Sequence, residues 1–298
     1  MNEQLFLCGL SKSQLAIAKP GRQLFLHGER PNVRLNIENI RTRLLAVEPP
    51  LAADLLEIAT YVFAADCCVR RGGVHLSNFG DHWRRSLRLV IAVRRPEIWS
   101  EITHSATLCD ALRFLTEDEW HFDFLPLINP PSVSQYLSGL QDQPSERSGE
   151  PSIVMFSGGL DSFAGAAHEL HNTGAHVYLV SRRTGVGGMV DARQRDLARS
   201  LNDKYPLRVI HAPVEAGMTR ETEAVEHTQR SRSFLLMAIG MIAATMEKSH
   251  RIRFYENGIM SINLPLASHV VGTRATRSTH PRTLLSCNAL PILFRTAP

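Results

Sequence analysis

Residues 153–162 read Ile-Val-Met-Phe-Ser-Gly-Gly-Leu-Asp-Ser, and this stretch decides the fold that we expect for the second half of the chain. It predicts a short buried strand, then a turn, then a helix that begins near Ser162. Glycines allow positive φ angles and close approach to a ligand, and N–H groups at a helix start attract anions. Ser157 and Ser162 add hydroxyl donors, and Asp161 is a candidate ligand for hydrated Mg²⁺. We therefore predict a nucleoside triphosphate site, although the same residue types also build ordinary turns.

Two common nucleotide-binding motifs are absent from the chain. No Gly-Lys-Ser or Gly-Lys-Thr occurs, so the lysine of a Walker A loop is missing. The glycine pattern of dinucleotide-binding folds, G-x-G-x-x-G, is also missing. A nucleotide site in this chain must therefore use a phosphate-binding loop other than these two.

The composition is that of a soluble globular protein. The chain has 298 residues, of which 44% are hydrophobic and 21% are charged. Its net charge of +4 produces only a weak electrostatic field, which neither requires nor excludes nucleic-acid binding. The five cysteines contain no Cys-x-x-Cys pair, which favours reduced thiols. The apolar stretch 50–69 is interrupted by acidic residues, and residues 1–30 lack the pattern of a secretory signal. We expect a cytoplasmic protein with no membrane partner.

The chain divides at a stretch rich in Pro, Ser, Gly and Gln. We predict an α+β N-terminal domain of unknown role over 1–128, a linker over 129–151, a nucleotide-binding domain over 152–281 and an atypical tail over 282–298. In the first domain, alternating or apolar runs predict strands at 14–18, 23–26, 33–37, 86–93 and around 120–124. Helical spacing predicts helices over 49–72 and 104–115.

The second half alternates between strands and helices. Strands are predicted at 153–156, 176–181, 207–211 and 252–255, and helices at 162–173, 190–204 and 231–248. This order predicts a doubly wound parallel sheet, in which ligands bind at the carboxyl ends of the strands. Three polar segments follow strands and are expected to converge there: residues 157–162, 181–184 and 256–258.

The motif Ser-Gly-Gly-Leu-Asp-Ser after a strand resembles the pyrophosphate loop (PP-loop) of the N-type ATP pyrophosphatases, whose fold is of the adenine nucleotide alpha hydrolase-like (HUP) type. Four further segments, 191–198, 229–235, 256–258 and 274–281, resemble those of QueC-like (7-cyano-7-deazaguanine synthase-like) proteins. The likeness is greatest to the QueC-like proteins of Qat-type anti-phage systems, and it covers about 152–281.

The resemblance implies an ATP-dependent ligase that forms a C–N bond. Such an enzyme adenylates a carboxylate, such as 7-carboxy-7-deazaguanine, and releases pyrophosphate. The implied ligands are ATP, Mg²⁺ and a deazaguanine-type carboxylate, and other defence proteins are candidate partners.

The same resemblance implies the site residues. The phosphates and Mg²⁺ are assigned to the loop, that is Ser157, Gly158, Gly159, Leu160, Asp161 and Ser162. Ser181, Glu256 and Asn257 are further candidates, Glu256 for a second metal contact or for the purine edge of the substrate. Arg230 or Arg232 could supply the positive charge that an α-phosphate transition state needs. The alternatives are a solvated first helical turn for the arginines and a surface strand end for Glu256.

One departure concerns zinc. QueC family members carry a four-cysteine zinc site near the C-terminus, whereas only Cys287 lies beyond residue 109 here. The family's zinc site is therefore absent from this chain, and the unusual residues 282–298 suggest a truncation or an altered reading frame.

Two other functions remain open. A tRNA-modifying PP-loop enzyme could bind phosphates through the arginines at 70, 71, 84, 85, 88, 94 and 95. A non-catalytic nucleotide-binding subunit of a defence complex is the third hypothesis, and the missing cysteines favour it.

Overall fold

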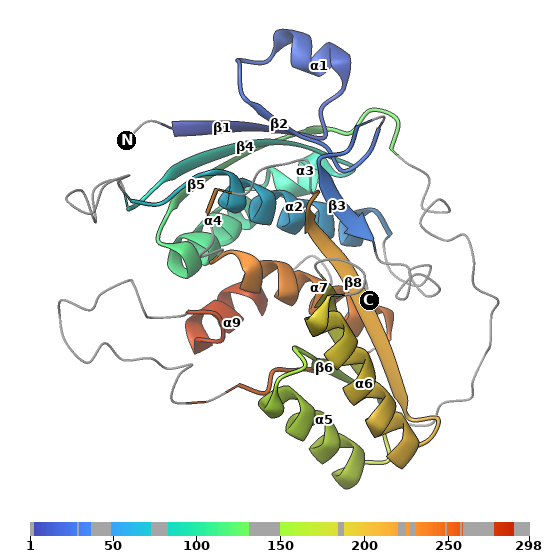
Figure 1. Cartoon of the computed structure of the whole chain (residues 1–298). Helices are drawn as coiled ribbons and strands as arrows, with labels where there is room; N and C mark the ends of the chain where they lie inside the picture. Colours follow the sequence, from blue (N-terminus) through green and yellow to red (C-terminus); the bar gives the residue numbers. More distant parts are fainter. Residues whose placement is uncertain are drawn as a thin grey trace, which may run out of the picture.

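The computed structural model describes residues 3–28, 30–36, 49–72, 83–130, 150–183, 188–219, 225–226, 230–247, 249–256, 258 and 277–288. They form an α/β fold with one sheet of four strands and a second sheet of five strands. Most helices lie between the two sheets or on the far side of the second sheet, and the short helix over 12–17 lies on the outer side of the first sheet (Figure 1). Each helix in these ranges is too short or too polar to cross a lipid bilayer.

The first sheet is parallel throughout. Its strands, in spatial order, are β2 (Arg22–Leu24), β1 (Glu3–Cys8), β4 (Ser86–Val93) and β5 (Glu119–Pro126). The helices of this part are α1 (Lys12–Ile17), α2 (Pro49–Cys68), α3 (Pro96–Trp99) and α4 (Ile102–Thr116). The predicted α+β class was therefore wrong for this part, because parallel strands joined through helices make it α/β.

The segment predicted as a strand at 14–18 lies mostly in helix α1. The Ser11 hydroxyl accepts a hydrogen bond from the Gln14 N–H at 3.3 Å, and the Gln14 Oε1 accepts one from the Ser11 N–H at 2.9 Å. This reciprocal capping box stabilises a helix start, and it outweighs the short apolar alternation that suggested a strand.

The second sheet contains the strands predicted for the second half. Its spatial order is β3 (Val33–Asn36), β8 (Val209–Met218), β7 (Val177–Arg183), β6 (Ser152–Met155) and β9 (Ile252–Arg253). All neighbours are parallel except β3, which is antiparallel to β8. The helices are α5 (Leu160–Asn172), α6 (Met189–Lys204), α7 (Arg232–Met246) and α9 (Pro281–Asn288). Because the chain runs from β6 to β7 and β8 on one side and returns to β9 on the other, the order reverses between β6 and β9.

Helices cover both faces of this sheet. Val154 and Phe156 pack with residues of α5 and α6 in one apolar cluster. Ile153 and Met155, whose side chains alternate to the opposite face, pack with residues of α7 in another cluster. Strand β3, predicted within the N-terminal domain, joins this sheet through the pairs Val33–Met218 and Asn36–Glu215.

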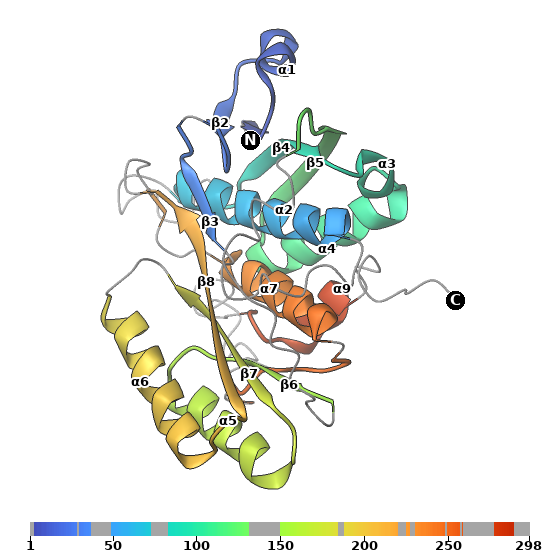
Figure 2. The ribbon, with the colours of Figure 1, turned by 90° about the vertical axis from the view of Figure 1, so that its right-hand side faces the viewer.

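Helix α2 lies between the two halves of the molecule. Its side chains from Leu51 to Cys68 are buried on every face, with only Ala53 half-buried. The helix is mostly apolar, and its buried acidic residues Asp54, Glu57 and Asp66 pair with arginines, so it can be covered on all sides. It packs against β3, β4, β8 and α7 (Figure 2). One apolar core therefore extends from the first sheet to the second.

Four buried charges join α2 to the first sheet. Asp118 accepts hydrogen bonds from Arg71 and from Arg85, each at 2.6 Å between Nη2 and Oδ2. Asp66, at the end of α2, pairs with the same two arginines. Asp66 also accepts bonds from the N–H and hydroxyl of Ser231, at 2.9 and 2.6 Å, and so holds the start of α7. Burial raises the pKa of Asp66, but the Arg85 and Arg71 charges outweigh it and hold the pKa below its usual value.

The arginines considered for RNA binding do not form an open phosphate-binding face. Those at 71 and 85 belong to this buried cluster, and Arg94 binds Asp54 and Glu57. The arginines at 88 and 95 pair with surface carboxylates. Five of the seven guanidinium groups are thus paired with acidic side chains, which opposes phosphate binding by this group.

The substitution Asp118→Asn tests the buried cluster. It removes one of the two negative charges that neutralise two buried arginines. We therefore expect the free energy of unfolding, measured by urea denaturation, to fall by about 3–5 kcal/mol. Asp110→Asn is the control, because Asp110 pairs with Arg113 at the surface and its loss should cost less than about 1 kcal/mol. Equal effects of the two substitutions would contradict a structural role for the cluster.

Candidate nucleotide-binding site

The loop at 157–162 forms the turn that its glycines predicted. Gly158 has a φ of +77°, in the left-handed region, and Gly159 is the N-cap of α5. The Ser157 Oγ accepts a hydrogen bond from the Gly159 N–H at 3.2 Å and lies 3.1 Å from the Ser162 Oγ. No described side chain caps α5, so the N–H groups of its first turn are available to an anion.

Gln194 of α6 braces this loop. Its Nε2 donates to the carbonyl of Ser157 at 3.1 Å, and the side chain is buried. A Cβ on Gly158 would lie 2.8 Å from the Gln194 Cγ, and 3.7 Å from the Nε of Arg193. Glycine is therefore required at 158 both for its φ angle and for space. Gln194 lies in the segment 191–198 that carries the family resemblance, but its role as a brace has no signal in the sequence.

Two carboxylates lie near one another at the point where the strand order reverses. Asp161 is exposed in the first turn of α5, and Glu256 follows β9. Partial burial raises the pKa of Glu256, and the negative charge of Asp161 raises it further. Two carboxylates together with substrate phosphates suit Mg²⁺, whereas no group of three or more His, Cys, Asp or Glu side chains in the described ranges could hold a metal ion. Asn257 lies outside the described residues.

Tyr255 holds the segment that carries Glu256. Its hydroxyl donates to Glu169 of α5 at 2.6 Å, and its ring lies against Gly165, where a Cβ would come within 2.0 Å of the Tyr255 Cγ. The glycine at 165 thus admits the ring, and the hydrogen bond fixes β9 against α5.

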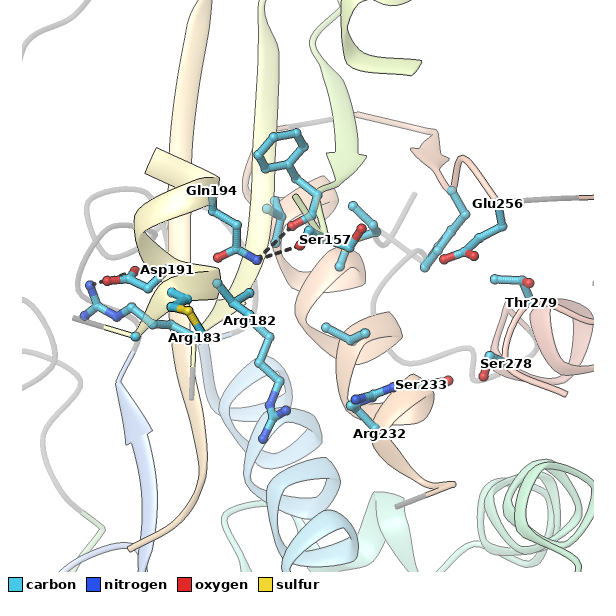
Figure 3. A pocket seen from close by; sticks show the side chains of 18 residues that line it. Ser157, Arg182, Arg183, Asp191, Gln194, Arg232, Ser233, Glu256, Ser278 and Thr279 are labelled. Carbon is cyan, nitrogen blue, oxygen red and sulfur yellow. Dashed lines mark hydrogen bonds and ion pairs between the residues drawn. The ribbon is translucent and has the colours of Figure 1, made fainter. Parts of the chain in front are cut away.

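A cavity of about 720 Å³ opens beside the loop (Figure 3). Its volume is within the range of small-molecule sites, roughly 300–1,000 Å³. It is lined from β6, β7, α6, α7 and the segments 254–256 and 278–279. The polar lining residues are Ser157, Arg182, Arg183, Asp191, Gln194, Arg232, Ser233, Glu256, Ser278 and Thr279. The ends of β6 and β9 and the start of α7 therefore bring Ser157, Glu256 and Arg232, three of the predicted residues, to one cavity.

Arg182 and Arg232 carry positive charge into this cavity. Neither forms an ion pair with a described carboxylate, whereas Arg183 lies 3.9 Å from Asp191. The Arg182 Nε donates to the Ala216 carbonyl at 2.9 Å, and its guanidinium stacks 4.4 Å from the Phe63 ring centroid. Burial lowers the pKa of Arg182 to about 10, and the nearby charge of Arg232 contributes to the decrease. Two such groups favour an anionic ligand.

Seven of the predicted residues that the structure describes do not line the cavity. Five of them are the loop residues that follow Ser157, namely Gly158, Gly159, Leu160, Asp161 and Ser162. The other two are Arg230 and Ser181. Arg230 donates to Glu117 at 2.7 Å and lies over the Trp83 ring at 5.2 Å. Ser181 is buried and its Oγ lies 2.8 Å from the His211 Nε2. The expected ligand contacts of Arg230 and Ser181 are therefore not supported, because protein groups occupy their polar atoms.

Glu117 ties the N-terminal half to the cavity wall. It ends α4 with a φ of +65° and accepts hydrogen bonds from Arg230 at 2.7 Å and Arg277 at 2.8 Å. Arg277 directly precedes the lining segment 278–279, and Arg230 lies two residues before the lining segment 232–233. Sequence patterns gave no signal for this tie.

Alanine at position 158 should disturb the loop. Gly158→Ala places a Cβ against Gln194 at a positive φ, so we expect roughly 1–2 kcal/mol of strain and weaker nucleotide binding. Isothermal titration calorimetry with Mg-ATP measures the affinity. Gly174→Ala is the control, since nothing lies within 4 Å of a Cβ there, and it should bind as the parent does. Unchanged affinity in Gly158→Ala would contradict the assigned loop geometry.

The ionised Glu117 carboxylate should stabilise the folded protein at neutral pH, and this stabilisation should be lost in acid. Burial raises the pKa of this group, but the Arg230 hydrogen bond and the Arg277 charge outweigh it, and the pKa lies below its usual value. Its contribution is then present above the unfolded-state pKa of about 4.3 and is lost as pH falls through the lower folded-state value. The stability difference between the parent and Glu117→Gln, measured by urea denaturation, should shrink from pH 7 towards pH 3. A difference independent of pH would refute the role of the charge.

Comparisons with models of known protein families, with curated proteins and with solved structures find no match to this chain. The ligand must therefore be inferred from the geometry of the site. The braced loop, the two carboxylates and the two cavity arginines are the features that carry that inference.

Proposed function

We propose that the chain binds ATP with Mg²⁺ in a doubly wound PP-loop domain of the HUP type and adenylates a carboxylate substrate. The observation that carries the proposal is the position of the loop. It contains Gly158 at positive φ and precedes the uncapped start of α5, and its first residue, Ser157, lines a cavity at the reversal of strand order. Open α/β sheets bind ligands at such a point.

The phosphate chain would bind to the N–H groups of the loop and the first turn of α5. Asp161 and Glu256 would hold the cation, which neutralises charge on the phosphate oxygens. Arg193, whose Nε lies near the loop, adds positive charge on the α6 side. These groups would orient the triphosphate so that its α-phosphorus faces the cavity.

The reaction would be an in-line displacement at the α-phosphorus. A substrate carboxylate oxygen forms the new P–O bond, the bond to the bridging oxygen of the β-phosphate breaks, and pyrophosphate leaves with the electron pair. Arg232 would hold the incoming carboxylate and would stabilise the charge that develops between it and the α-phosphate. Serine hydroxyls at 233 and 278 would help to orient the carboxylate.

A deazaguanine-type carboxylate, in a QueC-like defence or modification pathway, is the substrate class that the sequence resemblance favours. The C–N bond would then form when an amine attacks the acyl-adenylate. A tRNA substrate is disfavoured because most of its candidate arginines pair with carboxylates.

Pyrophosphate release from ATP in the presence of 7-carboxy-7-deazaguanine tests the reaction. Release that depends on the carboxylate is the expected result. A chain that binds Mg-ATP without releasing pyrophosphate would instead be a non-catalytic nucleotide-binding subunit, and the enzyme proposal would be rejected.

Asp161→Ala tests the phosphate site separately. We expect Mg-ATP affinity, measured by calorimetry, to fall at least roughly tenfold, which corresponds to about 1.4 kcal/mol. Asp196→Ala is the matched control, because Asp196 is an exposed carboxylate of α6 paired only at the surface with Arg199 among the described residues. If Asp161→Ala binds Mg-ATP as tightly as the control, the loop does not hold the nucleotide.

A further inference from the structure

We infer that Arg182 and Arg232 form a second anion subsite, distinct from the glycine loop, that binds the carboxylate or phosphate group of a small organic second substrate. The inference deepens the proposed function. It rests on that function only for the later reaction of the bound anion with ATP. Binding itself depends on the two arginines.

The two side chains come from different elements and line the same cavity. Arg182 lies at the end of β7, and Arg232 is the first residue of α7. In Figure 3, Arg182 extends away from Ser157 and Gln194 towards α2, on the side of the cavity where Arg232 also lies. The subsite is thus separated from the loop that would hold the phosphate chain.

The guanidinium of Arg182 is positioned by its surroundings but left without a described acidic partner. The Ala216 carbonyl accepts from its Nε, the Phe63 ring supports its face, and its Nη atoms donate to no described residue. Gly217 makes room for the side chain, because a Cβ there would lie 3.1 Å from Arg182 Nη2. This arrangement leaves the outer edge of the fork for a bidentate contact.

Arg182 is half-buried and Arg232 is exposed, so water screens the repulsion between these two like charges only in part. An anion between them removes this repulsion and gains charge-assisted hydrogen bonds. The depressed pKa of Arg182, caused by burial and by Arg232, reflects the same unfavourable pairing. Val180, Leu236 and Phe254 line the cavity as well, so the uncharged part of the substrate would contact apolar side chains.

The N-terminal half helps to build this subsite. Phe63 belongs to α2, and Ser231, which precedes Arg232, is held by Asp66 at the end of α2. Both arginines are therefore positioned by the same helix. The N-terminal half, whose sequence carries no catalytic motif, would therefore contribute to the specificity for the second substrate.

Calorimetric titration of the full chain, saturated with Mg²⁺ and the α,β-methylene analogue of ATP, tests the inference. Inorganic phosphate is the probe in one arm and benzoate in the other, which separates phosphate from carboxylate recognition. We expect at least one of them to bind, and Arg182→Gln and Arg232→Gln each to weaken that binding roughly tenfold or more. Arg34→Gln, which removes a surface arginine of β3 paired with Glu215, should have no effect.

A second measurement separates ligand binding from a structural role. Without anions, Arg232→Gln relieves the repulsion, so its melting temperature should rise above that of the parent. Arg182→Lys keeps the charge but loses the fork, and it should bind the anion more weakly while remaining folded. Anion affinity that is unchanged in Arg232→Gln and Arg182→Lys would overturn the subsite, as would a fall in the anion-free melting temperature of Arg232→Gln.

The outcomes also distinguish this inference from the proposed function. Competition between the nucleotide analogue and the probe would show a single shared site and overturn the inference. If the analogue fails to bind while the probe still binds in an Arg182-dependent manner, the proposed ATP site is rejected and the anion subsite stands.

Discussion

The buried ion cluster of Asp66, Arg71, Arg85 and Asp118 is the constraint on which the arrangement of the site depends. Charges removed from water are costly unless they are paired and hydrogen-bonded, and here each arginine contacts both carboxylates. The cluster joins the end of α2, the start of β4 and the turn before β5. Through Ser231 it also determines where α7 begins. The start of α7, and with it the backbone position of Arg232, is therefore held by charges from the first half of the chain.

The two halves of the molecule act as one structure around the cavity. Helix α2 is buried from both sides, β3 extends the second sheet, and Glu117 holds the arginines at 230 and 277. The first sheet contributes no residue to the cavity lining, yet it positions the segments that do. Its contribution is to position these segments. The start of α7 and the turn before α9 have no strong capping or turn motif of their own that would fix them.

The site was only partly predictable from the sequence. Some of its residues are positioned by neighbours in the chain, and others by residues far away in the sequence. Local chemistry was sufficient for the loop at 157–162, since the strand, the glycines and the helix start are adjacent in sequence. Arg230 and Arg232 could not be distinguished in this way. Both are basic residues at a helix start, and the difference arises because Glu117, more than a hundred residues earlier, binds Arg230. Arg182 and Gln194 lie in the segments 181–184 and 191–198 that the sequence indicated, but their individual roles were not predicted, because those roles depend on Phe63 and Gly158 from other elements.

The sequence by itself determined the alternation of strands and helices in the second half and the glycine turn between β6 and α5, because hydrophobic period and turn chemistry act over a few residues. It also placed the long helix α2 by its apolar spacing. Only the tertiary structure decided that the first sheet is parallel, that β3 belongs to the second sheet, and which arginines face the cavity. Those features depend on strand pairing and on burial of charge, and both are settled between residues far apart in the chain.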